Sequence, residues 1–222
     1  MFIYQNFKDI KKELPKDVTL VAVSKTKPVA DILEAYREGH RDFGENKVQE
    51  MVNKHEQLPG DIRWHMIGHV QSNKVKYMAS FVTLIHGVDK LSTLKEINKQ
   101  AIKHDRVIDC LLQVRIAREE TKFGLPFVQV QDLIESQELK ELDHVRITGL
   151  MGMATFTEDK QQISSEFKGL QSFFQEMKSR GHELKILSMG MSGDYKIALK
   201  HGSNMVRIGS ALFGDRNYIA QD

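Results

Sequence analysis

The chain has 222 residues, and its 32 Lys and Arg against 30 Asp and Glu give a formal net charge of +2. This balance predicts no nucleic acid or other strongly charged partner. The single cysteine, Cys110, excludes an intramolecular disulfide and a zinc site built from several thiolates. No apolar run reaches membrane-spanning length and no secretory signal opens the chain, so we expect one cytoplasmic domain over residues 1–222.

The first predicted elements are a helix, a strand and a second helix. Apolar residues three and four apart predict an amphipathic helix over residues 6–17. A run of Val, Leu and Ala follows at 19–24 and ends before Pro28, which stops a strand and suits the start of a helix. Helical spacing then continues to Gly39, which completes one strand-then-helix unit.

The same unit recurs along the chain to residue 214. The eight predicted strands cover residues 19–24, 41–46, 62–68, 83–88, 108–116, 145–153, 184–191 and 205–209. They are short apolar runs, which is typical of parallel strands buried on both faces. The pattern predicts an α/β fold, a (β/α)8 TIM barrel over residues 19–214. An open doubly wound sheet is the alternative, because periodicity does not establish closure.

Lys25 follows the first predicted strand, at the end where such barrels carry their active sites. Its side chain shares a face with Val21 and Val23. If that face points into the barrel, partial desolvation would lower the pKa of the amine and favour its attack on carbonyl groups. The alternative is a solvated loop at 24–28, which Lys25 alone does not exclude.

The last two predicted strands carry the other polar candidates. Arg207 interrupts an apolar strand, and a buried arginine requires an acid, a phosphate or a ligand acceptor as its partner. A buried ion pair with a barrel carboxylate is the alternative. The turns after these strands combine serine with glycine, as phosphate-binding turns do, at Ser192, Gly193, Gly209 and Ser210. The alternative for the first turn is that Ser192 and Asp194 cap the helix that follows it.

A lysine, an arginine and two phosphate-type turns around one barrel mouth suggest a phosphorylated carbonyl compound held as an imine. Pyridoxal 5′-phosphate (PLP) is the first candidate, and a sugar-phosphate intermediate of an aldolase is the alternative. We predict no metal site, because His65 and His69 are four residues apart on a strand end and loop rather than on a helix.

Several motifs occur in a characteristic order between residues 19 and 214. They are Val21–Pro28, Phe43–Asn46 with Gln49–Glu50, Trp64–Lys74, Gly149–Met153, Ser188–Asp194, Val206–Ser210 and Phe213–Gly214. Together they resemble the pyridoxal phosphate homeostasis protein family, a single-domain version of the alanine-racemase barrel. The resemblance implies the PLP-dependent fold type III without its second β domain. Three departures from the family pattern, Lys47, Val70 and Lys196, lie outside the implied cofactor contacts, although Lys47 could alter the charge at the mouth.

The resemblance also implies roles for individual residues. Lys25 would hold PLP as a Schiff base, and Arg207 would face the pyridine nitrogen. The phosphate would be received by Ser192, Gly193, Gly209 and Ser210. The resemblance implies that Asn46 and His65 lie beside the PLP ring or beside residues that contact it. No residue is assigned a catalytic role.

Arg207 also bears on the expected activity. Because an arginine stays protonated, a ring nitrogen opposite it stays unprotonated and the cofactor is a poor electron sink. Residues outside the barrel are too few for the second domain that racemases use. We therefore expect a monomeric PLP carrier or buffer in intracellular PLP homeostasis, without turnover. PLP-dependent apoenzymes are the candidate partners, with no nucleic acid or membrane. A small PLP-dependent racemase or decarboxylase is the alternative.

Overall fold

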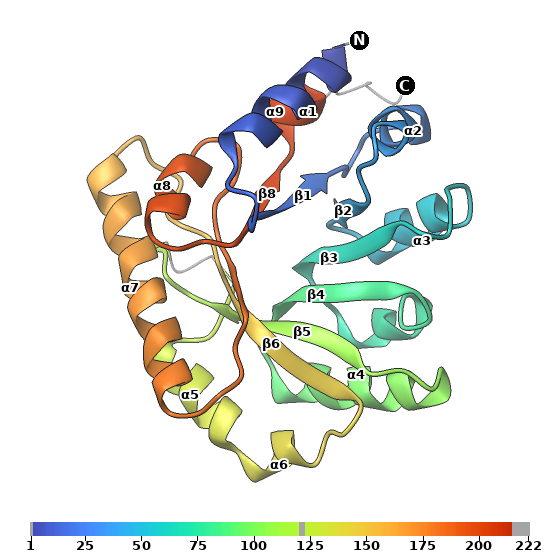
Figure 1. The fold of residues 1–222 in the computed structure, drawn as a ribbon. Coiled ribbons are helices and arrows are strands. Elements are labelled where there is room, and N and C mark those ends of the chain that lie inside the picture. The colour runs from blue at the N-terminus through green and yellow to red at the C-terminus, as the bar shows by residue number, and fades with distance from the viewer. Residues whose placement is uncertain (1, 120–122, 215–222) are drawn as a thin grey trace.

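The computed structural model describes residues 2–119 and 123–214. Eight parallel strands pair in chain order, and the last strand pairs with the first to close a barrel. Helices surround the barrel, as Figure 1 shows. The closure confirms the predicted TIM barrel and excludes the open doubly wound sheet.

All eight predicted strands occur, with small differences at their ends. The strands are β1 (Thr19–Val23), β2 (Asp42–Glu45), β3 (Arg63–His69), β4 (Val82–Val88), β5 (Ile108–Val114), β6 (Val145–Gly152), β7 (Ile186–Ser188) and β8 (Met205–Ile208). The helices are α1 (Phe2–Glu13), α2 (Val29–Arg37), α3 (Val48–His55), η1 (Ser72–Tyr77), α4 (Leu91–Lys103), α5 (Phe127–Glu135), α6 (Gln137–Lys140), α7 (Lys160–Ser179), α8 (Tyr195–Lys200) and α9 (Ser210–Phe213). Of these, η1 is a 3-10 helix.

The N-terminal helix requires a correction. The prediction placed it over residues 6–17, but α1 begins at Phe2 and ends at Glu13. Proline disfavours the helical conformation of the residue before it and lacks a backbone N–H, so Pro15 ends the helix. α1 lies beside α9 (Figure 1), and the rings of Phe7 and Phe213 meet edge to face at a centroid distance of 5.6 Å. This contact joins the first helix to the end of the barrel.

Two apolar layers follow from the alternation of side chains along the strands. The outer layer lies between the barrel and the helices, and it contains Leu20 and Ala22 of β1. The inner layer contains Val21, Leu84, Leu111, Met151 and Met205. Cys110 belongs to the outer layer, where burial raises the pKa of its thiol. No helix in the described residues is long and apolar enough to cross a membrane.

The amino end of the barrel carries ion pairs between adjacent strands. Arg63 donates two hydrogen bonds to the carboxylate of Asp42, at 2.7 and 2.5 Å, where β2 and β3 begin. Arg146 makes the same forked contact with Asp109 near the beginnings of β6 and β5. These pairs satisfy the charges at this end, so a ligand site is expected at the opposite, carboxyl end.

Candidate functional site

A cavity of about 770 Å³ lies at the carboxyl ends of the strands. Its volume falls in the range of small-molecule pockets, roughly 300–1,000 Å³. The residues that line it are Val23, Lys25, Lys27, Asn46, Ile67, Gly68, His69, Gln113, Phe123, Met153, Phe156, Met191, Ser192, Gly193, Arg207, Gly209, Ser210 and Gly214. Seven of the eight predicted cofactor-binding residues are among them, and the exception is His65.

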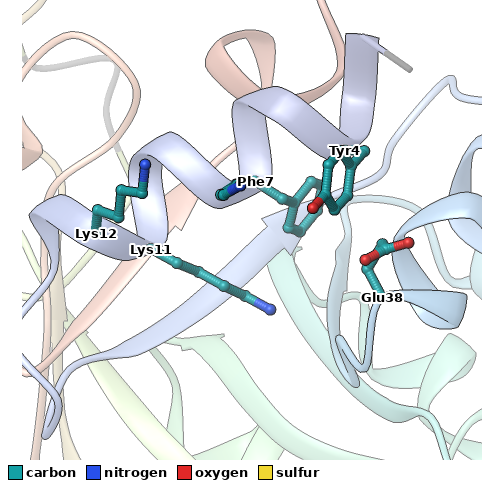
Figure 2. Close-up of a pocket in the computed structure, with 6 residues that line it drawn as sticks. Tyr4, Phe7, Lys11, Lys12 and Glu38 are labelled. Carbon is teal, nitrogen blue, oxygen red and sulfur yellow. The ribbon is translucent and has the colours of Figure 1, made fainter.

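A second hollow, of about 340 Å³, lies along α1 near the end of α2. Figure 2 shows its wall, with the side chains of Tyr4, Phe7, Lys11 and Lys12 from α1 and that of Glu38 opposite. Phe7 is the one buried residue of its lining, and the charged side chains are exposed. With no buried polar group in its wall to orient a ligand, this hollow is a weaker candidate than the cavity at the barrel mouth.

Lys25 reaches the cavity because of the alternation along β1. Val21 lies in the inner apolar layer, and Val23 and Lys25 line the cavity above it. Lys25 is half-buried, in a turn closed by a 3.0 Å hydrogen bond from the N–H of Lys27 to the carbonyl oxygen of Ser24. The structure therefore places the Lys25 side chain at the cavity wall rather than in a fully solvated loop.

Lys27 is a second amine at the same wall, which the sequence argument does not select. Its Nζ donates hydrogen bonds of 3.0 Å to the carbonyl oxygens of Phe213 and Gly214, at the end of α9. Those contacts tie its amine to α9.

Arg207 lies on the inner face of β8 and is almost completely buried. Its guanidinium donates to the carbonyl oxygen and the hydroxyl of Ser188, at 2.9 and 2.6 Å, and to the carbonyl oxygen of Gly152 at 3.1 Å. Burial lowers its pKa to about 10, and the charge of Asp194 partly opposes that shift. Among the described residues no carboxylate forms an ion pair with Arg207, so the alternative of a buried ion pair is not what holds it.

A chain of hydrogen bonds runs from Arg207 through the barrel interior, and we call it the histidine relay: Arg207, Ser188, His86, His65 and Asp42. Ser188 Oγ lies 3.3 Å from His86 Nδ1, His86 Nε2 lies 3.0 Å from His65 Nδ1, and His65 Nε2 lies 3.1 Å from Asp42 Oδ1. Arginine only donates, and an ionised aspartate only accepts. His65 Nε2 therefore donates to Asp42. Where both rings are neutral, each remaining bond also donates in the direction from Arg207 to Asp42, and both histidines carry their proton on Nε2.

The environment of His86 favours its neutral form. His86 is fully buried, and burial lowers its pKa well below the usual value. Burial alone would raise the pKa of Asp42, but hydrogen bonds from Arg63 and His65 outweigh it and hold that pKa far below its usual range. Asp42 is therefore ionised. His65 lies beneath the cavity, where it can act on a ligand only through other residues.

The two predicted phosphate turns meet at one hydroxyl. Ser192 Oγ accepts hydrogen bonds from the N–H groups of Gly209 and Ala211, at 3.2 and 3.4 Å. Asp194 does not cap α8 with its side chain. Its carboxylate instead accepts a 2.5 Å hydrogen bond from the N–H of Met191, within the same turn. Two N–H groups of the second turn thus meet the Ser192 hydroxyl of the first turn at the cavity wall.

Asn46 lines the cavity after β2, and a glycine on the next strand allows it to lie there. A Cβ atom on Gly68 would lie 2.3 Å from the carbonyl oxygen of Asn46, too close for any side chain. Glycine at 68 therefore lets the ends of β2 and β3 come together beside the cavity.

The far wall contains residues that the sequence argument missed. Gln113 is the next-to-last residue of β5 and donates from its side chain to the carbonyl oxygen of Phe123 at 3.1 Å. The Phe123 ring stacks on His69 with a centroid distance of 4.2 Å. A polar residue at the end of an apolar strand, the signal that selected Arg207, could have selected Gln113. Within residues 2–119 and 123–214 no cluster of three or more His, Cys, Asp or Glu is suited to a metal ion.

Comparison with known sequences identifies a family and relatives that match most of the chain. A family model described as the N-terminal domain of alanine racemase matches residues 2–217. A pyridoxal phosphate homeostasis protein of Aquifex aeolicus is 39% identical over 201 residues, which cover 90% of this chain and 87% of the relative. A protein of the same name from Escherichia coli K12 is 36% identical over 208 residues, which cover 92% and 88%.

Solved structures agree with these matches. PipY of Synechococcus elongatus, with PLP bound, superposes with a TM-score of 0.87 at 33% identity, over 96% of this chain and 100% of PipY. Alanine racemase of Clostridium difficile superposes with a TM-score of 0.81 at 17% identity, over all of this chain and 58% of the racemase, and this match shows the barrel fold alone. The chain therefore belongs to the alanine racemase N-terminal domain family and, within it, to the pyridoxal phosphate homeostasis proteins.

Proposed function

We propose that this protein binds PLP at the mouth of its barrel and acts as a carrier or buffer in PLP homeostasis, with Lys25 forming a Schiff base to the cofactor. The observation that carries the proposal is the convergence on one cavity of the Lys25 amine, the Arg207 guanidinium and the two serine–glycine turns. The related PipY structure, which has PLP bound, supports it.

The cavity fits the chemical groups of PLP. An aldehyde forms a Schiff base with a primary amine, and Lys25 carries such an amine at the cavity wall. A phosphate requires converging N–H and hydroxyl donors, and Ser192, Gly193, Gly209 and Ser210 carry such groups on the two turns that line the cavity. In this structure the Gly209 N–H donates to Ser192 Oγ, and a bound phosphate would take the place of that hydroxyl as acceptor. Nothing lies within 4 Å of the position that a Cβ atom would take on Gly193, so this part of the wall has open space beside it.

The residues beside the cavity favour binding over turnover. Bound PLP supplies an aldehyde that condenses with an amine, with loss of water, and a ring that can withdraw electrons from a substrate. Arg207 keeps its proton, because its pKa of about 10 stays above neutral pH. A protonated guanidinium opposite the pyridine nitrogen keeps that nitrogen unprotonated, which weakens electron withdrawal by the ring.

The proposal extends to the cellular setting. A PLP buffer would supply cofactor to amino-acid metabolism from the cytoplasm, as a monomer, and PLP-dependent apoenzymes would be its recipients. Asn46 would contact the ring from the end of β2, and His65 would act through His86 on the ring-side arginine.

The proposal is tested by locating the cofactor chemically. The purified protein is mixed with PLP, reduced with borohydride and digested, and the modified lysine is identified by mass spectrometry. We expect a visible absorption band before reduction and a single adduct on Lys25. The Lys27→Ala variant should keep the adduct, and the Lys25→Ala variant should lose it.

Three results would contradict the proposal. An adduct of equal yield in Lys25→Ala would show that another lysine holds the cofactor. A sugar phosphate trapped without a visible band would favour the aldolase alternative. Exchange of the α-proton of an amino acid in deuterated water would show turnover and favour a small PLP-dependent enzyme.

A further inference from the structure

A buried cluster of charges lies behind the turn that carries Lys25, and we call it the turn clamp: Glu45 at the end of β2, with Glu50 and Lys54 of α3. Lys54 Nζ lies 2.7 Å from a carboxylate oxygen of Glu45 and 2.7 Å from one of Glu50. The side chain of Glu45 is 0% exposed, and that of Lys54 is 7% exposed. Charges are rarely buried to this degree unless they are paired.

The turn clamp holds the backbone on both sides of Lys25. Lys54 Nζ donates a 2.8 Å hydrogen bond to the carbonyl oxygen of Ser24, the residue before Lys25. Glu50 Oε1 accepts a 2.6 Å hydrogen bond from the N–H of Thr26, the residue after it. Ser24 is held again through its hydroxyl, which donates to Glu45 at 2.6 Å. Both peptide groups of Lys25 are thus fixed by charged partners, which form the stronger class of hydrogen bond.

The turn adopts a conformation that needs such support. Thr26 has a φ of +64°, in the left-handed region that β-branched residues rarely adopt. Such a conformation is strained and persists only where surrounding contacts impose it. The hydrogen bond from the Thr26 N–H to Glu50 is a contact of this kind, because it is made by the strained residue itself.

We propose that Glu50 and Lys54 are positioning residues, which hold the turn at Ser24–Lys27 so that the amine of Lys25 points into the cavity. This inference rests on the proposed function of Lys25. It assigns the turn clamp a role beyond stability, namely the presentation of the reacting amine. The clamp touches the backbone on either side of Lys25, and none of its three residues lines the cavity.

Three substitutions of Glu50 separate the hydrogen bond from the charge. Glu50→Gln keeps an oxygen that can accept from Thr26, Glu50→Asp keeps the charge but is too short to reach, and Glu50→Ala keeps neither. Amide hydrogen exchange at Thr26 is measured without PLP, and the rate of borohydride-trapped adduct formation on Lys25 is measured with PLP. We expect about tenfold faster exchange and about tenfold slower adduct formation in the Ala and Asp variants. The Gln variant should stay within about twofold of the wild type.

Glu56→Ala is the matched control, because Glu56 is an exposed glutamate that follows the same helix. It should change neither rate. If adduct formation in Glu50→Ala equals that of the wild type, the positioning role is overturned, even if Thr26 exchanges faster. Losses in the Gln and Ala variants with wild-type rates in the Asp variant would also overturn it, because they would indicate a role of the charge alone. A wild-type chain that forms no adduct would overturn the proposed function and this inference with it.

Discussion

Lys25 and Arg207 line the same cavity, but the protein holds them by different means. Behind Lys25 lies the turn clamp, in which a buried cation and two carboxylates meet within 2.7 Å. Arg207 instead donates to carbonyl oxygens and a hydroxyl, and beyond Ser188 the histidine relay continues the hydrogen bonds to Asp42. The turn at Lys25 is thus supported by ion pairs, whereas the Arg207 guanidinium is held by hydrogen bonds to uncharged acceptors.

The difference follows from what each side chain has to do in the proposed function. Lys25 must reach an aldehyde, and the clamp fixes the backbone on both sides of it through the carbonyl oxygen of Ser24 and the N–H of Thr26. Arg207 must keep its positive charge toward the ring, and the described groups that accept its hydrogen bonds are uncharged. The two sides should therefore respond differently to loss of a charge, loss of a hydroxyl and a change of pH.

The largest effect is expected at the centre of the turn clamp. Lys54→Met would leave Glu45 buried without its cation, and breaking a buried pair in this way costs about 4 kcal/mol. Urea unfolding at neutral pH measures the loss. Adding Glu45→Gln to the Lys54→Met chain removes the unpaired carboxylate charge and should recover at least half of the lost stability. A double variant no more stable than Lys54→Met would show that charge is not what holds this side.

A smaller effect is expected on the other side of the cavity. Ser188→Ala removes one acceptor of Arg207 and the hydrogen-bond partner of His86, and should cost about 1–2 kcal/mol. The same urea measurement applies. Ser179→Ala, an exposed serine at the end of α7, is the matched control and should change stability by less than about 0.5 kcal/mol. A loss as large as that of Lys54→Met would erase the distinction between the two sides.

The relay also predicts a dependence on pH. Burial lowers the pKa of His86, so the unfolded chain binds a proton near pH 6.5 that the folded chain does not. Stability should therefore fall as the pH drops below 6.5, and His86→Gln should reduce this fall.

His40, which is buried outside the relay, has its pKa lowered to about 4 by burial, so it also makes stability fall as the pH drops. Between pH 7.5 and 5.5, His40→Gln should remove about 1 kcal/mol of the loss.

Unfolding curves of the three chains at the two pH values check these expectations. An equal fall in stability for the wild type and His86→Gln would mean that His86 is protonated in the folded state. That result would contradict the relay, because a protonated His86 could not accept from Ser188.

The last prediction involves no loss of stability. The ring nitrogens of His65 and His86 should both show the neutral Nε2–H tautomer in 15N NMR spectra at pH 7.5, because each relay bond donates toward Asp42. An Nδ1–H tautomer at either histidine would reverse a bond of the relay and contradict its direction.

Much of the fold could be predicted from the sequence, because it depends on local patterns. Short apolar runs followed by helical spacing identified all eight strands, and the alternation along β1 placed Lys25 on the same face as Val21. The end of α1 was misplaced because the apolar spacing was extended past Pro15. The closure of the barrel required the structure, since it depends on the pairing of β8 with β1.

The contacts that hold Lys25 and Arg207 in place could not be predicted in the same way. His86 and Ser188 are 102 residues apart in the chain, and nothing local to either indicates that they meet. Glu45 and Glu50 belong to a recognised motif, but their role depends on Lys54 and on the shape of the turn at Thr26. Local sequence selects residues at strand ends, whereas the contacts behind them require the three-dimensional arrangement.

The central claim is that one cavity holds PLP between Lys25 and Arg207, and a crystal structure of the protein with PLP tests it most directly. The account predicts continuous density from Lys25 Nζ to the cofactor, the pyridine nitrogen facing Arg207, and the phosphate between the turns at Ser192–Gly193 and Gly209–Ser210. Density that joins PLP to Lys27 or to a lysine outside this cavity, with Lys25 turned to solvent, would contradict it.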